Sequence, residues 1–174
     1  GMSSSKPQFK LIIGLGNPDA KYKNTYHNIG HIFVDYLESQ MSNVPPGARL
    51  AKGGKCQMSK TDVYMNESGK FVKKALKQAG AKPEELLVAH DDSDIIIGSF
   101  KLSFERGAAG HHGIENIQAV IKTNNFWRLR IGIRPQPKAG MPRKKAEEFV
   151  LKKINQADLK VLEKVFEKIL PQIF

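Results

Sequence analysis

A histidine and a group of carboxylates in this chain have the types and spacing suited to general-base catalysis. His27 lies ten residues after Asn17, and the acidic segment 90–94 directly follows the apolar run 86–89. A lone histidine is more often a capping or surface residue. However, a carboxylate that binds one imidazole nitrogen fixes the tautomer and leaves the other nitrogen as a base. If the apolar runs are neighbouring strands, these polar groups meet at one edge of a sheet.

The segment Gly14-Leu15-Gly16-Asn17-Pro18-Asp19 follows another apolar run and predicts a loop at a strand end. A dinucleotide-binding fingerprint needs G-x-G-x-x-G opening a helix, but Asp19 replaces the third glycine and Pro18 interrupts the turn. A nucleotide cofactor is therefore disfavoured. Ligands of α/β sheets bind at strand ends, where Asn17 offers both a donor and an acceptor to an amide-like substrate.

Two further segments place polar groups at predicted helix starts. Asn66 precedes a helix predicted over 69–79, where it serves either as an N-cap or as a substrate contact. Gly110-His111-His112-Gly113 opens another helix, whose free N–H groups attract phosphate. No Gly-Lys-Ser/Thr occurs in this loop, so it is not an NTP-binding P-loop.

A metal site is the competing interpretation of the histidines and aspartates. Zinc requires several converging ligands and an ordered second shell, and no His-x-x-x-His pair lies within a predicted helix. A metal site is therefore disfavoured. The residues considered as ligands are His27, His90, Asp91, Asp94, His111 and His112. The single cysteine, Cys56, fits a reducing compartment and reads as a strand residue rather than a nucleophile.

Composition and charge favour a soluble domain that binds a polyanion. The 174 residues suit one compact domain, with 28 Lys and Arg against 17 acidic residues and a net charge of +11. The apolar runs are too short to cross a bilayer, and the start shows no secretory signal. We expect nucleic acid rather than a membrane as the partner. A basic protein with nothing bound remains an alternative.

Residues 1–8 are expected to be disordered or tag-derived, and 9–174 to form the domain. Apolar runs predict strands over 9–14 and 86–89, and strict alternation predicts a strand over 127–133 with one buried face. Short strands are also expected over 56–60, in a weakly patterned region, and over 99–104. Helical periodicity predicts helices over 28–41, 69–79, 157–170 and after residue 110, and Pro142 suits the first turn of another helix. Alternating strands and helices predict an α/β layered domain.

Several motifs in order carry a resemblance to a known family. They are Gly14-Leu15-Gly16-Asn17-Pro18, His27-Asn28-Ile29-Gly30, Tyr64-Met65-Asn66-Glu67-Ser68-Gly69, His90-Asp91-Asp92-Ser93-Asp94, Gly110-His111-His112-Gly113 and Arg128-Leu129-Arg130-Ile131-Gly132-Ile133. From about residue 9 to 170 the chain resembles the bacterial-type peptidyl-tRNA hydrolases. With this resemblance, we expect a single-domain, three-layer α/β/α fold around a twisted, mixed, mostly parallel sheet.

The resemblance implies hydrolysis of the ester that joins a peptide to the 3′ ribose of tRNA, without a metal or an organic cofactor. It also implies a cytoplasmic monomer whose partner is peptidyl-tRNA and not DNA, with an organelle form as the alternative location. His27 would activate a water, Asp91 would orient His27, and Asn17 would contact the peptide end and help to distinguish peptidyl-tRNA from aminoacyl-tRNA. Asn66 would bind the substrate and stabilise the oxyanion. Tyr22 and Tyr64 would flank the 3′ end. Cations for the phosphates would come from Lys101, Arg128, Arg130 and Arg134. Such contacts are sequence-independent and salt-sensitive.

The chain departs from the family pattern at a few positions. His112 stands where the family has an asparagine that binds substrate, and it would keep a hydrogen bond that depends on pH. Ser103 replaces a second lysine two residues after Lys101. The region 48–62 and the C-terminus are shorter than usual. These changes leave a non-catalytic RNA-binding relative, like the chloroplast member that serves in group II intron splicing, as the alternative function.

Overall fold

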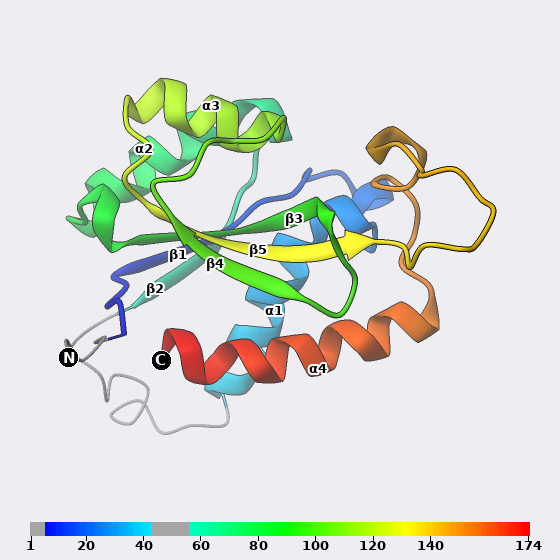
Figure 1. Ribbon diagram of the computed structural model, residues 1–174. Coiled ribbons are helices and arrows are strands. Elements are labelled where there is room, and N and C mark those ends of the chain that lie inside the picture. The colour runs from blue at the N-terminus through cyan, green and yellow to red at the C-terminus, as the bar shows by residue number, and fades with distance from the viewer. Residues whose placement is uncertain (1–5, 43–55) are drawn as a thin grey trace, which may run out of the picture.

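The computed structural model describes residues 6–42 and 56–174, which form a five-stranded sheet with helices on both faces (Figure 1). The strands are β1 (Leu11–Gly14), β2 (Gln57–Lys60), β3 (Leu86–Ile96), β4 (Phe100–Phe104) and β5 (Trp127–Arg134). The helices are α1 (Ile29–Ser42), α2 (Ser68–Ala79), α3 (His112–Ile121) and α4 (Gln156–Ile173). The order is β2-β1-β3-β5-β4; β4 runs antiparallel to β5 and the other neighbours are parallel. The predicted mixed, mostly parallel sheet is confirmed.

Two apolar clusters hold the layers together, one on each face of the sheet. Ile12 of β1 packs in the cluster of α1 and α4, with Phe33 and Phe166. Its neighbour Ile13 packs in the cluster of α2 and α3, with Val72. Successive residues of a strand point to opposite faces, so a strand buried on both faces must be apolar throughout. This explains the unbroken apolar run at residues 11–13.

Two glycines allow α1 to approach β1 closely. A Cβ added to Gly14 would lie 2.2 Å from the carbonyl oxygen of Gly30, and one added to Gly30 would lie 2.3 Å from that of Ala89. Any larger residue would therefore push the helix off the sheet. Since Gly30 follows His27 by three residues, this contact also sets where His27 lies relative to the carboxyl ends of β1 and β3.

The structure corrects three expectations about the elements. β3 continues to Ile96 rather than ending at residue 89, because His90 and Asp91 pair with β5. β5 is buried on both faces rather than one. Pro142 does not begin a helix. Instead a short 3₁₀ turn, Ala146–Glu148, forms where the Glu148 carboxylate accepts a hydrogen bond from the backbone N–H of Lys145.

The ends of the elements otherwise agree with prediction to within a few residues. α4 runs on to Ile173 and includes Pro171, three residues beyond its predicted end. Of the predicted N-terminal segment 1–8, only 6–8 are described, and of the shortened region 48–62 only 56–62, where β2 runs. Within the described ranges, no helix is both long and apolar enough to span a bilayer.

Candidate active site

A buried aspartate joins two histidines at the carboxyl edge of the sheet. His27 lies in a 3₁₀ turn before α1, Asp91 in β3, and His111 at the N-cap of α3. The Nδ1 atom of His27 lies 2.7 Å from Oδ2 of Asp91, and Nε2 of His111 lies 2.9 Å from Oδ1. The Asp91 side chain is 3% exposed. The predicted convergence of His27 and Asp91 is therefore present, and His111 joins it.

The hydrogen bonds assign the tautomers of both histidines. An ionised carboxylate only accepts, so Nδ1 of His27 and Nε2 of His111 carry the protons that face Asp91. The second nitrogen of His111, Nδ1, accepts from the backbone N–H of Ile114 at 3.3 Å. His111 thus has both nitrogens occupied. The Nε2 atom of His27 keeps its lone pair, so His27 is the histidine of this cluster that is able to act as a base.

Charge and burial act in opposite directions on this cluster. Burial lowers the pKa of His27, but the charge of Asp91 and its hydrogen bond outweigh that effect, and the pKa is raised above 6.5. Burial raises the pKa of Asp91, but the charges and hydrogen bonds of His27 and His111 hold it well below its usual range. Asp91 is therefore ionised near neutral pH, and its charge stabilises a protonated His27.

A cavity of about 760 Å³ opens in front of His27. Most of the residues predicted to bind substrate line it. The lining residues are Asn17, His27, Tyr64, Met65, Asn66, Glu67 and His112. Tyr22 is not among them, and the ammonium of Lys21 lies 5.0 Å from the centre of its ring. The structure thus brings Asn17, Asn66 and His112 together around His27, but leaves Tyr22 outside the lining.

Asn17 is fixed by three hydrogen bonds. Its backbone N–H donates to the side-chain oxygen of Asn28 and its carbonyl accepts from the amide nitrogen of Asn28, both at 2.9 Å. Its own Oδ1 accepts from the backbone N–H of Met65 at 2.8 Å. An N–H can only donate, so the atom that faces Met65 must be the oxygen. The Nδ2 group of Asn17 is left as a donor for a ligand.

Asn28 is a positioning residue for the Asn17 loop that the residue-by-residue analysis of the sequence did not single out. It is 1% exposed and both its amide atoms bind the backbone of Asn17. The signals in the sequence are its place directly after His27 and its membership of the His27-Asn28-Ile29-Gly30 motif. Asn66, for its part, is not the N-cap of α2: it lies in the 3₁₀ turn Met65–Glu67, and Glu67 occupies the N-cap. Its exposed side chain is free to face the cavity.

Tyr64 stands at the rim of the cavity. Its side chain is 46% exposed and its hydroxyl donates to Oδ2 of Asp19 at 2.7 Å. That bond joins the segment before α2 to the loop that carries Asn17. The Tyr64–Asp19 hydrogen bond therefore connects the two sides of the cavity entrance.

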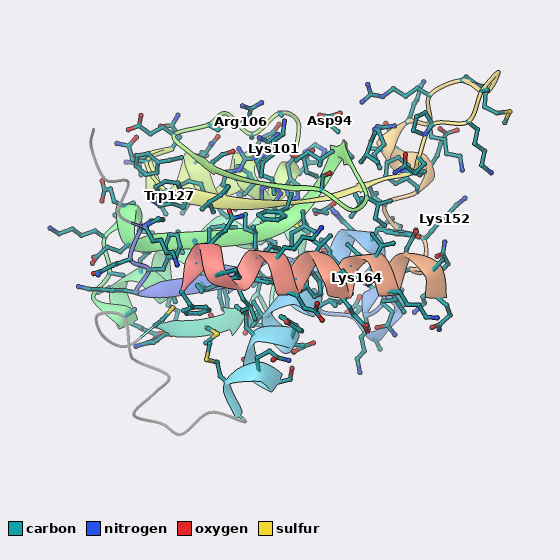
Figure 2. All side chains as sticks on the ribbon, turned by 60° about the horizontal axis from the view of Figure 1, so that its bottom comes forward. Asp94, Lys101, Arg106, Trp127, Lys152 and Lys164 are labelled. Carbon is teal, nitrogen blue, oxygen red and sulfur yellow. The ribbon has the colours of Figure 1, made fainter. Side chains whose placement is uncertain are left out.

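The arginines of β5 correct an expectation. Arg128 and Arg130 are 2% and 4% exposed. Arg130 donates to Asp92 at 2.9 Å and to the hydroxyl of Ser103 at 3.2 Å. Arg134 binds the carbonyls of Ser93 and Lys144. The guanidinium groups of Arg128 and Arg130 are buried, and that of Arg134 binds loop carbonyls. The expectation that Arg128 and Arg130 face RNA phosphates is therefore wrong. Lys101 is exposed, on the β4 side of the sheet (Figure 2).

His27, Asp91 and His111 also have ligand atoms within 4.8 Å of one another, as a metal site would need. Each oxygen of Asp91 already faces an imidazole N–H, so a cation would have to displace both protons. The arrangement suits a hydrogen-bonded proton relay better than a metal centre. That the reaction needs no metal stays a prediction.

Comparisons with known proteins agree on one family. The family described as peptidyl-tRNA hydrolase matches residues 11–173. A peptidyl-tRNA hydrolase of Aquifex aeolicus is 36% identical over 171 residues, covering 91% of this chain and 85% of the relative. One of Sulfurihydrogenibium is 38% identical over 177 residues, covering 91% and 94%. The crystal structure of the Acinetobacter baumannii peptidyl-tRNA hydrolase is 28% identical with a TM-score of 0.77, covering 97% and 88%.

Proposed function

The chain belongs to the peptidyl-tRNA hydrolase family, and on that premise we propose that it cleaves the ester between a peptide and the 3′ ribose of tRNA with His27 as general base. The observation that carries this assignment is the Asp91–His27 pair, which leaves one basic nitrogen beside the cavity. Hydrolysis of an ester needs a base, a water and donors for the oxyanion. His27 offers the base, and the side-chain amides of Asn17 and Asn66 in the cavity lining offer the donors.

The proposed reaction proceeds in two steps. Nε2 of His27 takes a proton from a water as its oxygen attacks the ester carbonyl, and Asp91 stabilises the imidazolium that forms. The tetrahedral oxyanion is stabilised by the amide N–H groups of Asn66. As the intermediate collapses, the bond to the 3′ ribose oxygen breaks and that oxygen takes the proton from His27. The products are a tRNA 3′ hydroxyl and a peptide carboxylic acid, which loses its proton to solvent to become the carboxylate.

Asn17 has a separate role in this proposal. Its fixed Nδ2 group donates to a carbonyl oxygen of the bound peptide, which positions the ester against the attacking water. Tyr64 and His112 complete the rim that receives the 3′ end. We further propose that the enzyme acts as a cytoplasmic monomer, without DNA or membrane partners.

The test is hydrolysis of an N-acyl-aminoacyl-tRNA, measured as release of uncharged tRNA. His27→Ala and His27→Gln should lower kcat by about 10² to 10⁴, the usual contribution of a general base. Affinity for tRNA should remain. His31→Gln is the matched control, because His31 lies on the other side of the Asn17 loop and binds Thr61 at 2.9 Å. RNA binding without turnover in the unmutated protein would overturn the proposal and leave a binding protein.

A further inference from the structure

Helix α2 carries a solvent face of one charge sign. Lys70, Lys73, Lys74 and Lys77 are all exposed, and the helix Ser68–Ala79 contains no acidic residue. Among the described residues, none of these lysines has a carboxylate within 4.0 Å. Like charges on one helix repel one another by a few tenths of a kcal/mol per pair, so this face is not arranged for helix stability.

Helix α4 shows what an ordinary charged face of this protein looks like. Lys160, Lys164 and Lys168 alternate there with Glu163 and Glu167, at the three- and four-residue spacings that pair opposite charges. Figure 1 places α2 and α4 on opposite faces of the sheet, and Figure 2 shows Lys164 on α4. The absence of acids from α2 is thus a property of that one helix.

The position of α2 connects its lysines to the cavity. Glu67, the N-cap of α2, and His112, the first residue of α3, both line the cavity. A second hollow, of about 480 Å³, lies at the other end of the two helices and is lined by Lys73, Lys77 and Lys122. The two helices therefore start together at the cavity, and the lysines extend away from it along about 18 Å of helix.

The chemistry of this face suits a phosphate backbone rather than a lipid surface. A membrane-binding helix combines basic residues with large exposed apolar ones. Large exposed apolar side chains in the described part of the chain occur at Tyr64, Ile96, Met141, Leu151 and Val161, none of them on α2. Since Arg128 and Arg130 are buried, cations for an RNA must also come from elsewhere on the surface.

We propose that Lys70, Lys73, Lys74 and Lys77 of α2, with Lys122 across the second hollow, form a docking surface for the sugar-phosphate backbone of the tRNA whose 3′ end occupies the cavity. This surface rests on the proposed function for the identity of its RNA. It lies outside the residues that perform the chemistry, so it contributes to binding and not to the rate of the bound complex.

The test compares two triple variants of equal composition. One carries Lys73→Gln, Lys74→Gln and Lys77→Gln, and the control carries Lys160→Gln, Lys164→Gln and Lys168→Gln. Each lowers the net charge by three from +11 and keeps good helix formers at solvent positions. The α2 variant should raise the KM for N-acetyl-aminoacyl-tRNA about tenfold or more and reduce the salt slope of binding by about 2 to 3, with kcat unchanged.

A short substrate separates the docking surface from the cavity. An N-acetyl-aminoacyl-CCA trinucleotide fills the cavity but does not extend along α2, so its KM should be the same in the unmutated protein and both variants. The proposal would be overturned if both triple variants raised the KM for tRNA by the same factor. It would also be overturned if the α2 variant raised the KM for the trinucleotide as much as the KM for tRNA. Dissociation constants for uncharged tRNA are measured alongside. Lysine-dependent tRNA binding without turnover would overturn the proposed hydrolysis while supporting the docking surface.

Discussion

The Nε–H of Arg128 donates to Nε2 of His90 at 3.1 Å, in the interior next to the cluster of His27, Asp91 and His111. His90 in turn donates from Nδ1 to the carbonyl of Asp91 at 2.7 Å. Burial, together with the charges of His111 and Arg128, lowers the pKa of His90 well below 6.5, so His90 is neutral. The other end of Arg128 holds the carbonyls of Arg106 and Gly107. This arginine therefore anchors the loop that leads into His111.

Arg128→Gln should destabilise the fold and slow the reaction. The loop carbonyls and the ring of His90 lose their donor, which costs about 2 to 3 kcal/mol of unfolding free energy for buried groups left unpaired. Because His90 packs against His111 with ring centres 4.7 Å apart, kcat should also fall. Urea unfolding and the hydrolysis assay measure the two effects. Lys101→Gln, an exposed change on β4, should alter stability by less than about 0.5 kcal/mol; equal losses in both variants would contradict the role of Arg128.

Two ion pairs of nearly equal length should differ widely in their contribution to stability. Arg130 and Asp92 lie 2.9 Å apart with side chains 5% and 9% exposed, whereas Arg143 and Asp94 lie 2.8 Å apart with side chains 67% and 58% exposed. Asp92→Asn leaves a buried guanidinium without its counter-charge and should cost about 3 to 5 kcal/mol. Asp94→Asn should cost about 0 to 1 kcal/mol, because water screens that pair. Denaturant titration distinguishes the outcomes, and similar values would show that burial does not decide them.

The pH dependence of hydrolysis should report the ionisation of His27. Its pKa is raised above 6.5 by Asp91, and only the neutral form accepts a proton. The rate should therefore fall as the pH decreases through that raised pKa. In Asp91→Asn the burial of His27 remains but the opposing charge is lost, so the midpoint should move to lower pH while kcat at the plateau drops. A profile of kcat against pH that keeps its midpoint in Asp91→Asn would refute the pairing.

His112→Asn should affect substrate handling but not stability. The side chain of His112 is 81% exposed and its Nδ1 lies 3.5 Å from the carboxylate of Glu115. The free energy of unfolding should change by less than about 0.5 kcal/mol, as is usual for a surface site. Since the residue lines the cavity, the KM for N-acyl-aminoacyl-tRNA should change. The same KM in His112→Asn as in the unmutated protein would contradict contact between His112 and the substrate.

Local patterns predicted the layers and most element ends correctly, because apolar periodicity is what buries one face of a helix or both faces of a strand. The same patterns failed for polar residues with tertiary partners. The alternation in 127–133 predicts that Arg128 and Arg130 lie on an exposed face. It does not reveal that Arg130 binds Asp92 and Ser103, or that Arg128 binds two loop carbonyls, because these partners come from other parts of the chain. The predicted end of β3 is too early for the same reason. Its acidic residues are typical of a loop, and only pairing with β5 makes them part of the strand.

The site followed a similar division. His27, Asp91 and Asn66 could be proposed from motifs. In the structure His27 pairs with Asp91, and His27 and Asn66 line the same cavity. His111 belongs to the site because the Asp91 carboxylate binds His27 with one oxygen and His111 with the other. Asn28 belongs to it because its side-chain amide makes two hydrogen bonds to the backbone of Asn17. Neither is encoded in spacing, because both arise where separate elements meet.

The hydrogen bond from Met65 fixes Asn17 with Nδ2 as its free donor, so in the proposed reaction Asn17 would select the group beside the ester by its hydrogen-bonding polarity. A free aminoacyl end presents a protonated amine, which near neutral pH only donates, and so it meets the donor Nδ2 of Asn17 as a mismatch. An acylated end presents a carbonyl oxygen and is matched. Asn17→Asp would invert this polarity, and the ratio of hydrolysis rates for acylated and free aminoacyl-tRNA should fall; an unchanged ratio would refute it. Aminoacyl-tRNA, which protein synthesis still needs, would then be spared because Asn17 offers a hydrogen-bond donor and not an acceptor to the group beside the ester.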